Sequence, residues 1–226
     1  DSRVNEKNLT ALVMAASRRG PTDPVAQLQN KSHKCLVEIA GKVMLERVIQ
    51  VLLDSSCFSR IAVSIENERI IRAVPQLHTW LDDGTIVVTP SRANLAGSVI
   101  AAVESLDDAL PLVITTGDNA LHPPELIRDF VDGFLSHTED AIAGFTSEAV
   151  VQEKFPDSGL AYHRIKDGGW SSCNLFGLRN EASLITAYIF EGGGQFGKKH
   201  VRILKAFGLI PFILYKLKWA TLDDIM

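Results

Sequence analysis

Short apolar runs alternate with helix-like segments along the first 145 residues, and this alternation most constrains the fold. The predicted strands cover residues 9–14, 60–65, 85–88, 111–115 and 141–145, and the predicted helices cover residues 44–53, 68–74, 95–106 and 124–135. The runs are rich in valine and isoleucine and lack clean alternation, which is typical of strands covered on both faces. The pattern therefore predicts an α/β domain with a mainly parallel sheet.

The last third of the chain has a different character. Residues 159–179 predict a hairpin that turns at Asp167-Gly168-Gly169, and helical segments follow at 182–191, 201–207 and 212–219. There is no internal repeat, low-complexity tract or clear linker. We therefore expect a single domain over residues 1–226.

Composition excludes several partners. The chain has 226 residues, 46% of them hydrophobic, and a net charge of −4, so it has no general attraction to nucleic acid or to an anionic membrane. The most apolar late stretch, 206–215, is too short to span a bilayer. Residues 1–8 are polar and do not resemble a signal peptide. The three cysteines are scattered, which indicates reduced thiols and a cytoplasmic protein.

The loop after the first predicted strand is small and basic. Ala15, Ala16 and Ser17 let the backbone approach a ligand closely, and Arg18 and Arg19 add charge suited to phosphate. Neither the P-loop nor the G-x-G-x-x-G spacing is present. The pattern predicts a phosphate cradle, with an ordinary strand-to-helix turn bearing surface arginines as the alternative.

Two further residues suit phosphate chemistry. Lys34 precedes an apolar segment and could neutralise charge on a transferring phosphoryl group, although a lone lysine is commonly a solvated surface charge. Asp118 follows the strand 111–115, where a carboxylate can hold Mg²⁺ or simply cap a turn. Ligands of parallel sheets bind at the carboxyl ends of strands, which directs attention to the loops after Met14, Val88 and Thr115.

The order of these motifs resembles a known family. The stretches "ALVMAASRRG", "HKCLVEIAGKVMLERVI" and "ITTGDNALHPPELI" are similar to the nucleotidyltransferases related to molybdenum cofactor guanylyltransferase, and "WSSCNLFGLR" resembles a substrate-side strand of one branch. The resemblance implies a glycosyltransferase-A-like (nucleotide-diphospho-sugar transferase) fold, a three-layer α/β/α sandwich with a mixed, mainly parallel sheet. Residues 9–145 would form its nucleotide-binding part, and residues 146–226 an acceptor-side hairpin and C-terminal helices.

The resemblance also implies a reaction. A nucleoside monophosphate (NMP) would pass from an NTP, GTP or CTP, to a small phosphorylated or sugar-like acceptor, with release of pyrophosphate. The residues that it assigns to catalysis are Arg18, Lys34 and Asp118, with Mg²⁺ on Asp118. Those that it assigns to the nucleotide are Ala15, Ala16, Ser17, Arg18, Arg19 and Lys34, with Asn94 and Ser98 near the base. On the acceptor side we expect Asn174, Lys198 and Lys199.

Some positions depart from the family pattern and leave alternatives open. Ala16 and Ser17 stand where the family usually has glycine, and the late carboxylates Asp223 and Asp224 follow no clear strand. A glycosyltransferase using a nucleotide sugar is one alternative, disfavoured because Asp118 is not part of an Asp-x-Asp motif. A non-catalytic nucleotide-binding or regulatory relative is another. The apolar segment 212–217 would suit burial in a homodimer.

Overall fold

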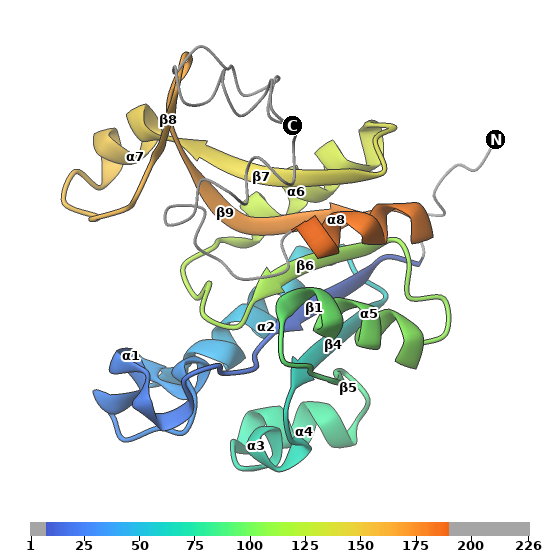
Figure 1. Cartoon of the computed structure of the whole chain (residues 1–226). Helices are drawn as coiled ribbons and strands as arrows, with labels where there is room; N and C mark the ends of the chain where they lie inside the picture. Colours follow the sequence, from blue (N-terminus) through green and yellow to red (C-terminus); the bar gives the residue numbers. More distant parts are fainter. Residues whose placement is uncertain (1–7, 190–226) are drawn as a thin grey trace. The chain divides into compact units, whose positions relative to one another are not determined.

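The computed structural model describes residues 8–189. The described chain falls into two compact units (Figure 1): the first comprises residues 8–141 and 175–189, and the second comprises residues 142–174. Strand β9 (Gly168–Leu178) contributes to both units.

The first unit is built on a mixed sheet. Its strand order is β5 (Val87–Pro90), β4 (Arg60–Ile65), β1 (Thr10–Met14), β6 (Leu112–Thr116) and then the end of β9. The first four strands are parallel, and β9 runs antiparallel to β6. Strand β1 is buried because β4 and β6 flank it and helices cover it, which explains its unbroken apolar run. The predicted mixed, mainly parallel sheet is confirmed.

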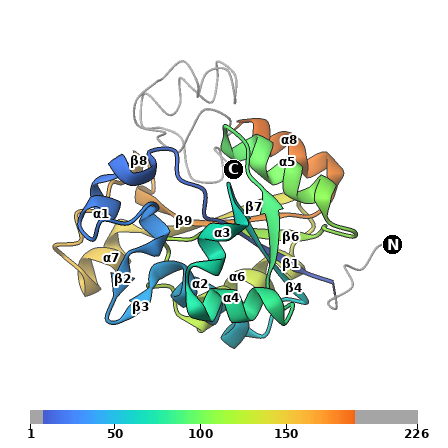
Figure 2. The same cartoon turned by 90° about the horizontal axis from the view of Figure 1, so that it is seen from below.

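Helices cover both faces of this sheet. Helices α2 (Met44–Ser55) and α6 (Pro124–Ser136) pack together, as do α5 (Leu95–Ser105) and α8 (Leu184–Ile189). Figure 2 shows the first pair on one face of the sheet and the second pair on the other, so the three-layer sandwich is confirmed. Each apolar side chain that α2 buries contributes about 1.5–3 kcal/mol. The buried apolar residues of α2 are Met44, Leu45, Val48, Ile49 and Leu52.

Between β1 and α2 the chain forms several short elements. They are the 3-10 helices η1 (Gly20–Thr22) and η2 (Lys34–Leu36), helix α1 (Pro24–Gln27), and strands β2 (Glu38–Ile39) and β3 (Lys42–Val43). The turn between β2 and β3 holds Ala40 at φ 49° and Gly41 at φ 75°. Positive φ at both central residues is the geometry of a tight two-residue hairpin, and glycine adopts it without steric cost. This hairpin leads the chain from Lys34 directly into α2.

The structure contains one helix that was not predicted from the sequence, and one strand starts later than predicted. Residues 75–82 form a helix, α4 (Pro75–Asp82), after the shorter α3 (Glu68–Arg72). Pro75 occupies the first turn of α4, and Leu77 and Trp80 bury one face of it. Since α4 and the turn after it take up residues 75–86, strand β5 starts at residue 87, later than the predicted residue 85.

The second unit holds strand β7 (Ala141–Ser147) from residue 142, helix α7 (Glu148–Lys154), strand β8 (His163–Ile165) and the first part of β9. The predicted hairpin is present, and it turns at residues 166–167 because Gly168 and Gly169 already pair with β8. Helices predicted at 201–207 and 212–219 lie outside the described residues. No helix within residues 8–189 is both long and apolar enough to cross a bilayer.

Candidate active site

Three loops of the first unit meet at the carboxyl edge of its sheet. The register pairs Met14 of β1 with Thr116 of β6, and the Gly117 N–H donates to the Met14 carbonyl at 2.9 Å. A Cβ added to Gly117 would lie 3.2 Å from the Cβ of Cys35 and 3.4 Å from that of Ala15. In the sequence, Ala15 begins the basic loop, Cys35 follows Lys34, and Gly117 precedes Asp118. The predicted convergence of the three motifs is therefore present.

Lys34 and Asp118 form an ion pair at this edge. Lys34 Nζ donates to Asp118 Oδ2 at 2.5 Å, and the Thr116 hydroxyl donates to Asp118 Oδ1 at 2.6 Å. Burial would raise the pKa of Asp118, but the hydrogen bonds from Lys34 and Thr116 outweigh it and hold that pKa below its ordinary value. The Asp118 carboxylate is therefore ionised at neutral pH and oriented through both oxygens.

Local hydrogen bonds of Asn119 hold the turn that follows strand β6. The Asn119 amide donates to the Thr115 hydroxyl at 3.1 Å, and the Asn119 N–H donates to the Thr116 carbonyl at 3.2 Å. Cys35 is buried behind the loop, and its thiol donates to the Ala15 carbonyl. The two Asn119 contacts hold the turn that carries Asp118, and the Cys35 contact joins the segment after Lys34 to the end of β1.

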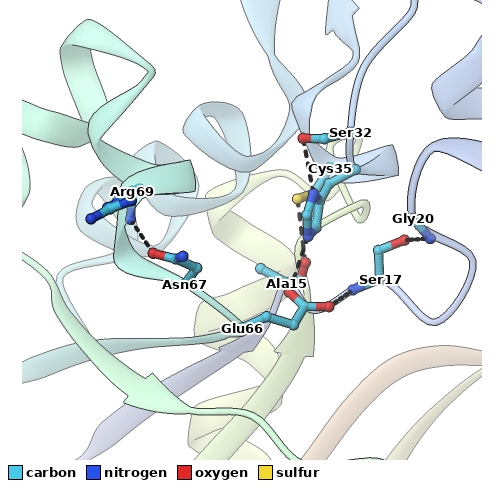
Figure 3. Close-up of polar contacts among 9 residues, drawn as sticks. Ala15, Ser17, Gly20, Ser32, Cys35, Glu66, Asn67 and Arg69 are labelled. Atoms are coloured by element: carbon cyan, nitrogen blue, oxygen red, sulfur yellow. Dashed lines mark hydrogen bonds and ion pairs between the residues drawn. The ribbon is translucent and has the colours of Figure 1, made fainter.

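The basic loop presents one backbone amide to an anion. The Ser17 N–H donates to Glu66 Oε1 at 2.7 Å, and the Ser17 hydroxyl accepts from the Gly20 N–H at 2.9 Å (Figure 3). Arg18 and Arg19 are exposed, and within residues 8–189 neither guanidinium has an ion-pair or hydrogen-bond partner. Two free cations therefore stand beside an amide that already binds a carboxylate.

Ala15 and Ala16 differ in exposure. Ala15 is buried and continues the sheet, because its N–H donates to the Ser64 carbonyl at 2.9 Å. Ala16 is exposed at the start of the loop. The small side chain at residue 15 lets Cys35 and Gly117 approach the end of β1.

Sequence reasoning did not identify three residues of this site: Thr116, Glu66 and His33. Thr116 orients Asp118, while Glu66 follows β4 and bridges the basic loop to His33, whose Nε2 lies 3.0 Å from Glu66 Oε2. The rule that ligands gather at the ends of parallel strands applies to the loop after Ile65 as well, so it directs attention to Glu66 but does not predict its contact with Ser17.

Asn94 and Ser98 lie at the start of α5. The Asn94 side chain caps this helix by accepting from the Gly97 N–H at 2.6 Å. Ser98 is buried, and its hydroxyl accepts from the Arg92 N–H at 2.8 Å and donates to the Asn94 carbonyl at 2.9 Å. Both side chains support the loop that leads into α5, and contact with a base stays a prediction.

None of the three residues expected on the acceptor side belongs to the described part of the first unit. Asn174 belongs to the second unit, where it is exposed and has φ 51° within β9. Lys198 and Lys199 lie outside the described residues. The roles of all three stay predictions.

Asp118 and its neighbours offer oxygen atoms of the kind that a hard cation such as Mg²⁺ binds. Mg²⁺ is usually bound by one or two carboxylates, with substrate phosphates and water completing its shell. Asp118 supplies one ionised carboxylate with the Thr116 hydroxyl beside it. No group of three or more His, Cys, Asp or Glu side chains within residues 8–189 could hold a metal ion. The residues fit a magnesium ion that arrives with a phosphate ligand.

The chain resembles a curated protein over part of its length. The chain is 28% identical over 123 residues to 2-C-methyl-D-erythritol 4-phosphate cytidylyltransferase of Rhodococcus opacus (strain B4), which covers 54% of this chain and 50% of that protein. The matched segment thus spans about half the length of this curated relative.

Two solved structures share the fold. A hypothetical transferase from Thermus thermophilus has a TM-score of 0.72 and 18% identity, covering 96% of this chain and 85% of that one. The 4-diphosphocytidyl-2C-methyl-D-erythritol synthase from Anaerococcus prevotii DSM 20548 has a TM-score of 0.59 and 12% identity, covering 92% and 85%. The model of the MobA-like NTP transferase domain matches residues 14–163, so this chain belongs to the MobA-like NTP transferase family.

Proposed function

We propose that this chain transfers a nucleoside monophosphate from an NTP to a small phosphorylated or sugar-like acceptor. The observation that carries the proposal is the Lys34–Asp118 pair beside the Ser17 amide, at one edge of the sheet. A cation, an ionised carboxylate and an anion-binding amide are the groups that binding of a triphosphate needs, and this pair and amide supply them. Family membership supports the same reaction class.

In this reaction an acceptor oxygen forms a bond to the α-phosphorus of the NTP. The bond from that phosphorus to the bridging oxygen breaks, and pyrophosphate leaves with the electron pair. The protein performs little covalent chemistry in such a transfer, so positioning and charge stabilisation account for its contribution. An acceptor phosphate oxygen is already ionised, whereas a hydroxyl acceptor must lose its proton.

The chain's own residues divide the task. The Ser17 amide and Arg18 bind phosphate oxygens, Arg18 through charge-assisted hydrogen bonds. Lys34 balances the charge that develops on the leaving pyrophosphate, and Asp118 keeps the Lys34 ammonium at the site until the nucleotide arrives. Asp118 would hold Mg²⁺, which supplies neutralisation of phosphate charge when bound.

CTP is the donor that we favour over GTP. The curated relative is named as a cytidylyltransferase acting on a phosphorylated polyol, and it shares 28% identity with this chain over 123 residues. We therefore propose a small phosphorylated acceptor. The three free cysteines support a reducing compartment, and we place the activity in the cytoplasm.

Thermal unfolding tests the proposal without knowledge of the acceptor. The wild type and Asp118→Ala are heated with CTP, GTP, ATP or UTP, each with and without Mg²⁺. A ligand at 100 times its Kd stabilises the native state by about 2.7 kcal/mol, and each kcal/mol shifts the Tm of a chain this size by about 2–4 °C. We expect a Mg²⁺-dependent shift with CTP that Asp118→Ala abolishes. No shift with any NTP would contradict the proposal.

A further inference from the structure

One backbone amide of the basic loop already binds an anion of the chain itself. The Ser17 N–H donates to Glu66 Oε1 at 2.7 Å, and 49 positions separate the two residues in the sequence. Figure 3 shows the Glu66 side chain reaching from the end of β4 to the loop. A carboxylate oxygen and a phosphate oxygen accept from such an amide in the same way. Glu66 therefore occupies an acceptor position at this amide that a phosphate oxygen is equally able to fill.

Glu66 is held in this place from its other side. His33 Nε2 lies 3.0 Å from Glu66 Oε2, and His33 Nδ1 lies 3.0 Å from the Ser32 hydroxyl oxygen. In the neutral ring, the Nε2–H donates to the carboxylate and Nδ1 accepts from Ser32. The His33 ring is 11% exposed, whereas the Glu66 side chain is 41% exposed. The ring is thus a fixed anchor, and the carboxylate has room to leave the Ser17 amide.

The other side chains proposed to bind phosphate form no ion pair with Glu66. Lys34 pairs with Asp118, and Arg18 and Arg19 have no ion-pair partner within the described residues. A ligand that displaces Glu66 must gain more from these cations than it loses at the Ser17 amide. A triphosphate reaches several of them at once, whereas a single phosphate group reaches few. The arrangement penalises anions that make few contacts.

We propose that Glu66 competes with phosphate for the Ser17 amide, and so sets which phosphate compounds the loop retains. The inference rests on the proposed function and adds a specificity-determining residue to it. An NTP displaces the Glu66 carboxylate when it binds. After transfer, the carboxylate returns to the Ser17 amide and opposes retention of pyrophosphate, since two anions cannot share one donor.

Calorimetric titration with inorganic pyrophosphate, without nucleotide or metal, tests the competition. Glu66→Gln keeps the length of the side chain and an oxygen acceptor but removes the charge. A hydrogen bond to a charged group is worth more than one to a neutral group, so we expect pyrophosphate to bind Glu66→Gln about tenfold more tightly than wild type. Unchanged or weaker binding would overturn the proposal.

Glu68→Gln is the matched control. Glu68 lies two positions away, pairs with Arg72 on α3, and its substitution changes the net charge by the same amount. We expect wild-type pyrophosphate affinity from it. Equal tightening in Glu68→Gln and Glu66→Gln would show a general charge effect and overturn the proposal.

A second measurement needs only the wild type. In protein labelled with ¹³C at glutamate, the Glu66 carboxyl signal reports the hydrogen bond from Ser17. We expect this signal to shift as CTP with Mg²⁺ saturates the protein, and a constant signal at saturation would overturn the proposal. If the wild type binds CTP but Glu66→Gln has wild-type affinity for pyrophosphate, this inference is wrong and the proposed function stands. If neither the wild type nor a variant binds CTP or pyrophosphate, the proposed function is wrong as well.

Discussion

Lys34 Nζ lies 2.5 Å from Asp118 Oδ2, although 84 positions separate these residues in the chain. Lys34 starts the 3-10 helix η2, and Asp118 follows the carboxyl end of β6. The pair places a cation and an oriented carboxylate where β1 opens into the basic loop. We propose that the Lys34 ammonium turns from this carboxylate to a phosphate of the nucleotide when the nucleotide binds.

Replacement of Lys34 by methionine tests the role of its charge. Methionine keeps the unbranched shape of the side chain and removes the ammonium, and a hydrogen bond to a charged group contributes about 1.5–3 kcal/mol. We expect Lys34→Met to raise the calorimetric Kd for CTP with Mg²⁺ at least tenfold. Lys34→Arg, which keeps the charge in a wider group, should lose less affinity. Wild-type affinity in Lys34→Met would refute this role.

The low pKa of Asp118 makes a contribution to stability that depends on pH. Because the pKa is lower in the folded state than in the unfolded state, the ionised carboxylate stabilises the fold at neutral pH. That contribution declines as the pH falls below about 3.9, the ordinary Asp value, and through the folded-state pKa. Urea unfolding of wild type and Asp118→Asn should therefore show a stability gap at pH 6 that narrows on acidification. A gap that widens in acid would contradict the assignment.

The Cys35 thiol should resist alkylation in the native protein. Burial, with the nearby charges of Asp118 and Glu66, raises the pKa of Cys35 to about 12. At pH 8 the thiolate fraction is then on the order of 10⁻⁴, and the thiolate is the reactive species. Mass spectrometry after iodoacetamide treatment should find Cys57, which is only partly buried, modified well before Cys35. Equal rates in the native protein would contradict the burial of Cys35.

A pair of glycine substitutions tests the packing of α6 on the sheet. A Cβ at Gly177 would lie 2.7 Å from the Phe134 ring, so Gly177→Ala forces the ring to move. Overpacking of this kind costs about 1–3 kcal/mol. A Cβ added at Gly133, on the same helix as Phe134, would lie more than 4 Å from any heavy atom other than those of its two chain neighbours and the neighbouring helix backbone. Gly133→Ala should therefore stabilise the protein by up to about 1 kcal/mol through helix propensity. Urea unfolding measures the change in the free energy of unfolding of each variant. A result in which Gly133→Ala destabilises the protein and Gly177→Ala does not would contradict this packing.

The parts of the site that could be predicted are those marked in the sequence by an apolar run or by a family motif. The run ending at Met14 and the run ending at Thr115 could both be identified as strands, and the resemblance assigned both Lys34 and Asp118 to catalysis, without the ion pair between them. Parallel pairing of β1 with β6 then brings their ends together. Lys34 reaches Asp118 through the η2 turn, a short local structure with no clear periodicity.

Glu66 and the start of α5 show what the sequence leaves open. Glu66 follows a predicted strand, but only the pairing of β4 with β1 brings it to the basic loop, and the order of parallel strands has no local signature. Asn94 and Ser98 have the composition of a helix cap, and their hydrogen bonds are local. Composition alone does not separate such a cap from a base contact.

We propose that an NTP lies on the edge formed by the basic loop, Lys34 and Asp118. Two-dimensional NMR of ¹⁵N-labelled wild type during titration with CTP and Mg²⁺ locates the bound nucleotide. We expect the largest shifts at the amides of residues 16–20, 34–35 and 117–119, and much smaller ones on the outer surface of α6. Shifts confined to other regions at saturation, or none at millimolar CTP, would contradict it.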